Sequence, residues 1–157
     1  MKKYEFTGEV KSWCGRTLHR IRATIAFGDV SAGDLGGWIE KEENLSHEGE
    51  AWVYGEARVC GKARVYGKAQ VFGEALVCDE AHWLGIACIG SRSDFTTFFR
   101  TKDLKIFVSC GCFRGDIDAF AEKVKKTHGD SRHARAYLAA VELAKIKIDL
   151  TDDIKED

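Results

Sequence analysis

The sequence predicts a mainly β protein with an α-helical C-terminal part, and three observations support this fold class. A six-residue repeat runs through residues 49–90. Apolar and polar residues alternate over parts of residues 4–30, as they do in half-buried strands. Two segments after residue 116 place apolar side chains at the spacing of an amphipathic helix.

The N-terminal part is predicted to form short strands that lead into the repeats. The segments YEFTGEV and TLHRIRATIAF have strand-like alternation, and four glycines between residues 28 and 37 precede Trp38. These glycines are predicted to turn the chain. Ile39 and Leu45 continue the repeat backwards in steps of six, so one irregular coil is expected before the regular repeats.

The repeat itself reads GEAWVY, GEARVC, GKARVY, GKAQVF, GEALVC, DEAHWL and GIACIG, seven hexads in succession. Alanine recurs in every hexad, and an apolar residue, usually valine, follows two places later. In a strand, residues two apart point to the same side, so both are predicted to face inward. A helix is not expected, because six is a poor multiple of 3.6.

The pattern resembles the hexapeptide-repeat left-handed β-helix, in which three hexads complete one coil. The resemblance implies a short left-handed parallel β-helix in which residues eighteen apart stack, such as Tyr54 on Phe72 and Cys60 on Cys78. So short a β-helix leaves its outward aromatic side chains exposed unless other parts of the protein cover them. We expect the N-terminal strands, the C-terminal segment and identical neighbours to cover them, in a homo-oligomer for which a trimer is favoured.

The period stops after residue 90. The segments DFTTFFR and LKIFVSCGCF, separated by TKD, predict a β-hairpin, and two helices follow, with Asp116 and Ser131 as their N-caps. We therefore predict N-terminal strands and β-helix over 1–90, a hairpin and two-helix module over 91–150, and a frayed acidic tail over 151–157.

Composition excludes several classes of function. The chain has 24 basic and 25 acidic side chains and a net charge of −1, which argues against a strongly cationic nucleic-acid binder, and duplex nucleic acid is not an expected partner. No apolar run is long enough to span a membrane, and no signal peptide is expected from the first residues, because no apolar stretch follows their two lysines. A cytoplasmic protein of a bacterial host, with its six cysteines as thiols, is expected.

Several segments outside the repeats carry a second resemblance. They are TLHRIRA at 17–23, GDLGGWIEKEENLSHEG at 33–49, GSRSDFTTFF at 90–99, VSCGCFRG at 108–115 and KKTHGDSRHARAYLA at 125–139. With the repeats, they are similar to a family of small phage- and prophage-encoded hexapeptide-repeat proteins. The resemblance implies a phage setting and assigns no reaction.

The main candidate site is a set of cationic residues around the start of the second helix, where free backbone N–H groups favour a phosphate. Guanidinium groups elsewhere offer bidentate contacts to phosphate, and Tyr137 offers a ring for stacking. The predicted ligand-binding residues are Arg92, Arg100, Arg114, His128, Ser131, Arg132, His133 and Tyr137. The alternative is a solvated helical face balanced by Glu122, Asp130 and Glu142.

Other candidate chemistry is less well supported by the pattern. His82 is the histidine inside the repeats and the candidate base of an acyltransferase. It lies between the two inward positions of its hexad, which predicts an outward surface side chain. Cys110 and Cys112 flank Gly111, and both thiols face one pocket only if Gly111 kinks the chain; the alternative is a pair of structural cysteines. The histidines show no metal-ligand grouping, so no metal and no cofactor are expected.

The sequence favours a binding protein over an enzyme and leaves both open. The favoured function is a non-enzymatic phage protein that sequesters a small anionic, nucleotide-like host defence signal. One alternative is an acyltransferase of the hexapeptide-repeat type. The other is a protein–protein interaction module that blocks a host defence protein.

Overall fold

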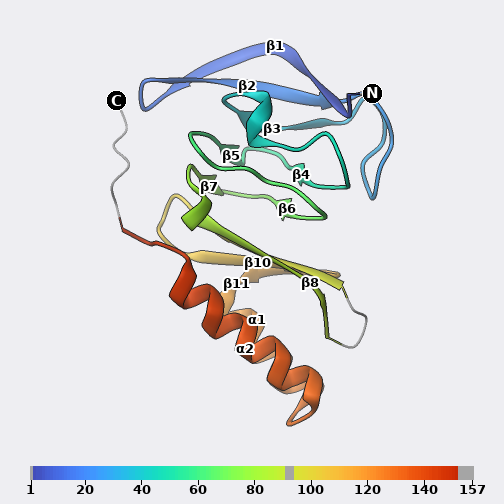
Figure 1. Cartoon of the computed structure of the whole chain (residues 1–157), viewed down its shortest axis with the longest axis vertical. Coiled ribbons are helices and arrows are strands. Elements are labelled where there is room, and N and C mark those ends of the chain that lie inside the picture. Colours follow the sequence, from blue (N-terminus) through green and yellow to red (C-terminus); the bar gives the residue numbers. More distant parts are fainter. Residues whose placement is uncertain (1, 91–93, 152–157) are drawn as a thin grey trace.

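The computed structural model describes residues 2–90 and 94–151 and is mainly β with two C-terminal helices (Figure 1). Its strands are β1 (Tyr4–Trp13), β2 (Arg16–Ala23), β3 (Leu35–Ile39), β4 (Trp52–Val53), β5 (Arg58–Val59), β6 (Gln70–Val71), β7 (Leu76–Val77), β8 (Trp83–Ile89), β9 (Asp94–Arg100), β10 (Ile106–Cys110) and β11 (Phe113–Asp116). Its helices are the 3₁₀ turns η1 (Glu42–Asn44) and η2 (Glu80–His82) and the α-helices α1 (Ile117–His128) and α2 (Arg132–Lys147). In the described part of the chain, no helix is long and apolar enough to cross a bilayer.

The repeats form stacked turns whose short strands pair in parallel. Val53 pairs with Val71 and Val59 with Val77, which is the predicted interval of eighteen residues. The earlier coil is also present: β3 pairs in parallel with β5. Leu45 forms a parallel bridge with Val65 on a further side of the stack. The alternation places the repeated apolar residues inside, where five alanines and five valines are at most 2% exposed: Ala51, Ala57, Ala63, Ala69, Ala75, Val53, Val59, Val65, Val71 and Val77.

The predicted N-terminal strands are present as β1 and β2, which form an antiparallel hairpin that closes one end of this stack (Figure 1). The Tyr4 hydroxyl donates to the Leu45 carbonyl oxygen at 2.7 Å. The buried Lys3 ammonium donates to the Ala51 carbonyl oxygen at 2.6 Å, and burial lowers the pKa of Lys3 to about 8. Backbone groups at the open end of the stack are thereby paired.

At the other end, the stack of turns stops before the six-residue pattern in the sequence does. The last two hexads, residues 79–90, were expected to continue the coil, but they form η2 and β8, and β8 pairs antiparallel with β9. Asp79 accepts the Ala81 N–H and starts η2. Trp83, at the position of the repeated valine, is buried in the same core as the valines. An indole is far larger than an isopropyl group, so this side chain fills the end of the core and leaves no room for another turn.

A four-stranded antiparallel sheet, in the order β11-β10-β9-β8, covers this end and separates two cores. Adjacent residues of β9 point to opposite faces: Phe99 packs in the core of the repeats, and Phe98 packs with α1 and α2. The predicted hairpin is present as β9 and β10, and β11 adds a strand that was not predicted. Both predicted helix caps are confirmed, since Asp116 accepts the Ala119 N–H and Ser131 the Ala134 N–H.

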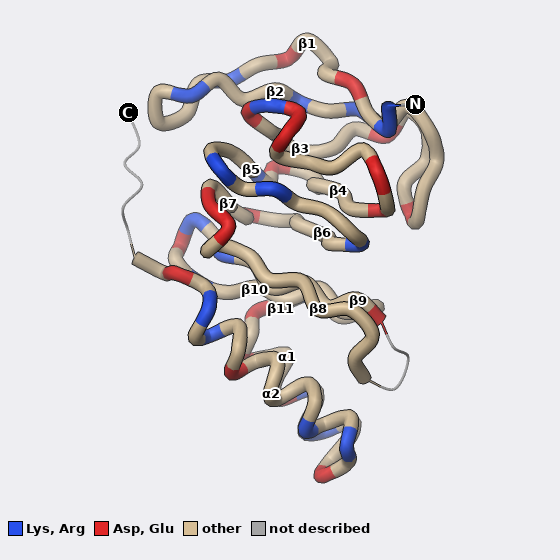
Figure 2. The backbone as a smooth tube through the Cα atoms, viewed as in Figure 1, with Lys and Arg blue, Asp and Glu red and all other residues tan. Residues whose placement is uncertain are grey.

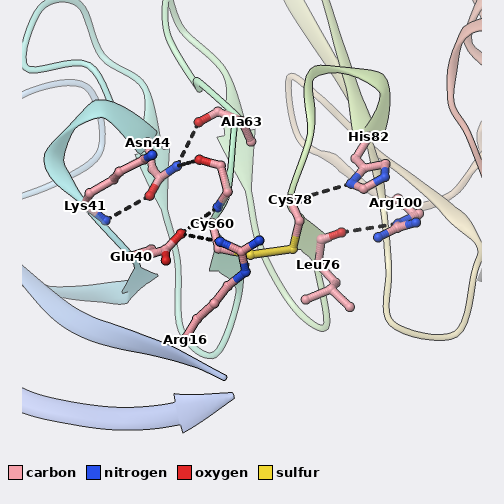
Figure 3. The surroundings of a disulfide bond; sticks show 11 residues. Arg16, Glu40, Lys41, Asn44, Cys60, Ala63, Leu76, Cys78, His82 and Arg100 are labelled. Carbon is pink, nitrogen blue, oxygen red and sulfur yellow. Dashed lines mark hydrogen bonds and ion pairs between the residues drawn. A yellow bond between two sulfur atoms is a disulfide. The ribbon is translucent and has the colours of Figure 1, made fainter. Parts of the chain in front are cut away.

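Cys60 and Cys78 form a disulfide, which corrects the prediction that all six cysteines are thiols (Figure 3). The two residues follow β5 and β7 on neighbouring turns of the stack, and their Cα atoms are 4.5 Å apart. This separation lies within the range that disulfides require. The eighteen-residue interval brings the sulfurs together, as the predicted stacking of Cys60 on Cys78 requires, but the bond between them was not expected. Cys14, Cys88, Cys110 and Cys112 form no disulfide.

The disulfide is expected to stabilise the stack by restricting the unfolded chain. Its sequence separation of 18 corresponds to a contribution of about 2–4 kcal/mol. The variant Cys60→Ala/Cys78→Ala should lower the free energy of unfolding by that amount in urea denaturation under non-reducing conditions. Cys88→Ala, which removes an exposed free thiol, is the matched control. Equal stability of the double variant and the wild type would contradict the cross-link.

Candidate ligand pocket

A pocket of about 230 Å³ lies between the turn that joins β10 to β11 and the two C-terminal helices. Its walls are largely aromatic and apolar, and a few polar groups converge on it, which is the usual character of a small-molecule site. The lining residues are Asp94, Cys110, Gly111, Cys112, Phe113, Phe120, Lys123, Val124, Thr127, His128 and Tyr137.

The turn that carries the two cysteines has the kink that the sequence analysis required. Cys110 pairs with Phe113, so Gly111 and Cys112 form a two-residue hairpin loop. Gly111 has φ +56°, a conformation that favours glycine, whereas Cys112 keeps a negative φ. Both thiols therefore line the same pocket. Cys110 is half-buried and Cys112 is exposed, so neither is an inert core cysteine.

Two hydroxyl groups flank the Cys110 sulfur. The fully buried Thr96 hydroxyl donates to Sγ at 3.2 Å, and Sγ lies 3.8 Å from the Tyr137 hydroxyl oxygen, toward which the thiol donates. Thr96 faces Cys110 because β9 and β10 are paired at this position. The sheet pairing and the α2 packing therefore fix the position of this thiol.

Aromatic side chains form the wall toward the helices. The His128 ring stacks on the Tyr137 ring with centroids 5.8 Å apart, and Phe120 meets Tyr137 edge-on at 5.6 Å. Tyr137 is 6% exposed, and His128 is half-buried. Gly90 lies directly behind the phenol, because a Cβ at this position would overlap the Tyr137 hydroxyl.

The charges of the pocket are mixed, with a cationic surrounding. Lys123 and His128 line it from α1, and Asp94 lines it at the start of β9. Figure 2 shows Lys and Arg on both helices near their junction. These exposed side chains include Lys125, Lys126, Arg132 and Arg135.

The structure brings two predicted ligand residues, His128 and Tyr137, into this pocket. His133, an exposed residue, is close to its edge, with its ring centroid 6.1 Å from that of His128. The Ser131 hydroxyl is engaged as the α2 N-cap, and Arg132 is exposed in the first turn of α2. Arg92 lies outside the described residues.

Two other predicted residues lie elsewhere, which corrects the sequence analysis. Arg100 is fully buried at the opposite end of β9 from Asp94; its guanidinium donates to the carbonyl oxygens of Leu76 at 3.4 Å and Thr151 at 3.2 Å. Seven residues of strand span roughly 20 Å, so this guanidinium cannot reach the pocket. Phe98 and Phe99, on the same strand, are buried in the two cores and offer no ring to the pocket.

Arg114 points to the other face of the sheet, because its neighbour Phe113 already faces the pocket. Its guanidinium lies 5.1 Å from the ring centroid of Tyr54 and 5.2 Å from that of Phe72. Burial raises the pKa of Tyr54, and the Arg114 charge acts in the opposite direction. Arg114 therefore covers the outward Tyr54 and Phe72 rings of the repeats.

His82 is buried, not outward as its position in the hexad predicted (Figure 3). It lies at the end of η2, where the coil has stopped, and its Nδ1 accepts the Cys78 N–H at 3.0 Å. His47, just before the repeats, accepts the Lys3 N–H at 3.1 Å and stacks on Tyr4. Within residues 2–90 and 94–151, no three His, Cys, Asp or Glu side chains are grouped to hold a metal ion.

The pocket residues that the sequence analysis did not assign to a ligand site are mainly Asp94, Lys123 and Thr127, together with the two thiols. The Cys110-Gly111-Cys112 motif was visible, but its geometry depended on a glycine conformation. Lys123 belongs to the cationic segment that the sequence marks before the second helix, whereas Asp94 reaches the pocket only through sheet packing and no local signal marks it.

Comparison with known proteins gives one limited similarity. The chain is 36% identical over 62 residues to the uncharacterized acetyltransferase YdcK of Escherichia coli (strain K12). The match covers 34% of this chain and 19% of that protein, so the chain spans about a fifth of the relative's length. No family model matches the chain.

The contact between Gly90 and Tyr137 gives a test of how the pocket wall is held. Gly90→Ala should displace the Tyr137 ring and lower the free energy of unfolding by about 1–3 kcal/mol more than Gly33→Ala. Both glycines have positive φ, +82° and +94°, but a Cβ at Gly33 meets no atom within 4 Å. Urea denaturation of the two variants is the measurement. Equal losses would contradict the close packing of Tyr137 behind the pocket.

Proposed function

We propose that this protein is a non-enzymatic binding protein of the phage type, and that its ligand is a small anionic, nucleotide-like host defence signal. The proposal includes a left-handed sense for the stacked repeats and self-association, with a trimer favoured, as the resemblance to phage hexapeptide-repeat proteins implies. The observation that carries it is the pocket beneath α1 and α2 with its aromatic wall and cationic edge.

The pocket chemistry supports a ligand with one flat and one anionic part. Its Tyr137 and Phe120 rings offer aromatic contact for a base, while Lys123 and His128 lie beside them in the lining. The volume of about 230 Å³ is below the roughly 300–1,000 Å³ of sites for drug-sized ligands. The enclosed part of the ligand is therefore about the size of a base or a phosphate group, and the remainder would extend along the exposed cations of the helix junction.

Titration with adenosine 5′-monophosphate, inorganic phosphate and adenosine tests this assignment. The mononucleotide should bind more tightly than either half. Lys123→Ala and Arg132→Ala/His133→Ala should each weaken it at least about tenfold, because a charge-assisted hydrogen bond contributes about 1.5–3 kcal/mol. Isothermal titration calorimetry is the measurement.

Lys105→Ala is the matched control, because Lys105 is an exposed lysine between β9 and β10 that does not line the pocket. Its affinity should equal that of the wild type. Native mass spectrometry of protein purified from a host with active defence signalling supplies an independent check, since the proposed ligand adds a few hundred daltons per site. Unchanged affinity in the Lys123 and Arg132/His133 variants would overturn the site assignment.

The partial similarity to an acetyltransferase favours a second candidate function, acyl transfer from coenzyme A. The coil surface has a depression of about 560 Å³ in which Lys41, Lys62 and Arg64 offer cations to the phosphates of such a cofactor. Glu43 and Glu80 share that depression and oppose this role. The buried His82 binds a backbone N–H, so it is poorly placed to act as the base.

The second candidate predicts that acetyl-coenzyme A binds the coil surface. Lys62→Ala/Arg64→Ala should then weaken binding at least about tenfold, and Lys123→Ala should leave it unchanged. Acetyl transfer to small amine and hydroxyl acceptors is followed by release of free coenzyme A. Absence of both binding and release would exclude this candidate without affecting the pocket assignment.

A further inference from the structure

We infer that Cys110 and Cys112 are a reactive dithiol that exchanges with small, charged disulfides entering the pocket. This activity does not depend on the binding of a nucleotide-like ligand. It accounts for three features that an anion site leaves unused: two free thiols in one pocket, the hydroxyls that hold one of them, and the carboxylate of Asp94.

The two thiols have different positions that fit successive steps of one exchange. Cys110 is half-buried, between the Thr96 and Tyr137 hydroxyls, and lines the pocket from the end of β10. Cys112 is exposed in the two-residue loop after it. Residues two apart have Cα atoms at most about 7 Å from each other, and a kink at Gly111 shortens this toward the 4.4–6.8 Å that disulfides use.

The chemistry balances without any group beyond the substrate. The Cys110 thiol loses its proton to solvent, and the thiolate attacks one sulfur of the substrate disulfide; a Cys110–substrate bond forms, the substrate S–S bond breaks, and one thiolate leaves. The Cys112 thiolate then attacks Cys110 Sγ and releases the second thiolate. The protein dithiol is oxidised by two electrons to a Cys110–Cys112 disulfide, and the substrate is reduced to two thiols, which take up the two protons.

Hydrogen-bond geometry supports Cys110 as the attacking sulfur. The Thr96 hydroxyl already donates to Sγ at 3.2 Å, and the Tyr137 hydroxyl, 3.8 Å away, is able to reverse its role and donate when the sulfur is anionic. Thr96 and Tyr137 are positioning residues here, because they act on the sulfur and not on the substrate.

The charges around the thiols define the substrate class. Lys123 and His128 suit the carboxylates of a substrate, and Asp94 suits its ammonium group. The pocket therefore complements a disulfide that carries both groups, as amino-acid and short-peptide disulfides do. The volume of about 230 Å³ accommodates a cysteine-sized part of such a molecule beside Cys110 and leaves the rest outside, including the half that departs as the thiolate.

The test is the reaction of the whole protein with oxidised glutathione, followed by non-reducing peptide mapping and intact mass. The wild type should form a Cys110–Cys112 disulfide with no lasting adduct on either of these two residues. Cys112→Ser should hold one glutathione on Cys110, formed at least about tenfold faster than on Cys88, an exposed free thiol outside the pocket. In Cys110→Ser, the remaining Cys112 should react no faster than Cys88.

Further variants separate reactivity from folding. Thr96→Val and Tyr137→Phe should each slow the adduct on Cys110 in the Cys112→Ser background, with the Cys88 rate as the internal reference. Asp94→Asn should reduce the preference for oxidised glutathione over uncharged bis(2-hydroxyethyl) disulfide. Cys88→Ser should leave the formation of the Cys110–Cys112 disulfide unchanged.

Two results would overturn the inference. One is a stable glutathione adduct on Cys110 or Cys112 of the wild type without a Cys110–Cys112 cross-link. The other is an adduct on Cys110 that forms no faster than on Cys88 in a Cys112→Ser protein with wild-type thermal stability. Either result would leave the nucleotide titration valid, because that measurement does not involve the thiols.

Discussion

The parallel stacking of the repeats is the interaction on which the rest of the structure depends. Val53 pairs with Val71 and Val59 with Val77, eighteen residues later, and backbone hydrogen bonds join the turns. Such a stack has two open ends that expose apolar side chains and unpaired backbone groups. Both ends must therefore be covered. The β1–β2 hairpin covers one end, and the sheet that contains β8 and β9 covers the other (Figure 1).

The pocket is a consequence of how the second end is closed. The closing sheet directs Phe99 into the core of the repeats and Phe98 to the opposite face, where α1 and α2 pack. That second core is complete around Phe98 and Val108 but not at the β10–β11 turn, where the chain presents Cys110 and Cys112 to the space beside Tyr137. The candidate site thus belongs to the element that closes the stack.

The two activities proposed for this pocket use different atoms. Ligand binding relies on the rings of Phe120 and Tyr137 and on the charge of Lys123, whereas disulfide exchange relies on the sulfur atoms of the turn. Asp94 distinguishes them, because its carboxylate opposes a purely anionic ligand and favours one that also carries an ammonium group. Both of these activities use the pocket beside α1 and α2, whereas the candidate acyl transfer would use the depression on the surface of the stacked repeats.

The sequence by itself determined the features that depend on short-range periodicity. The inward Ala and Val residues, the N-terminal strands, the β9–β10 hairpin and the caps Asp116 and Ser131 follow from local spacing and side-chain type, and the eighteen-residue interval follows from the resemblance to hexapeptide repeats. The tertiary structure alone decided features that depend on packing between distant segments. The Trp83 indole ends the stack two hexads early, burying His82, and β-strand alternation turns Arg114 away from the pocket. The Cys60–Cys78 bond was not expected although the stacking of these residues was. The left-handed conformation of Gly111 turns two thiols to one cavity, and sheet and helix packing add Asp94 and Lys123, because contacts between elements are not encoded at any single position of the chain.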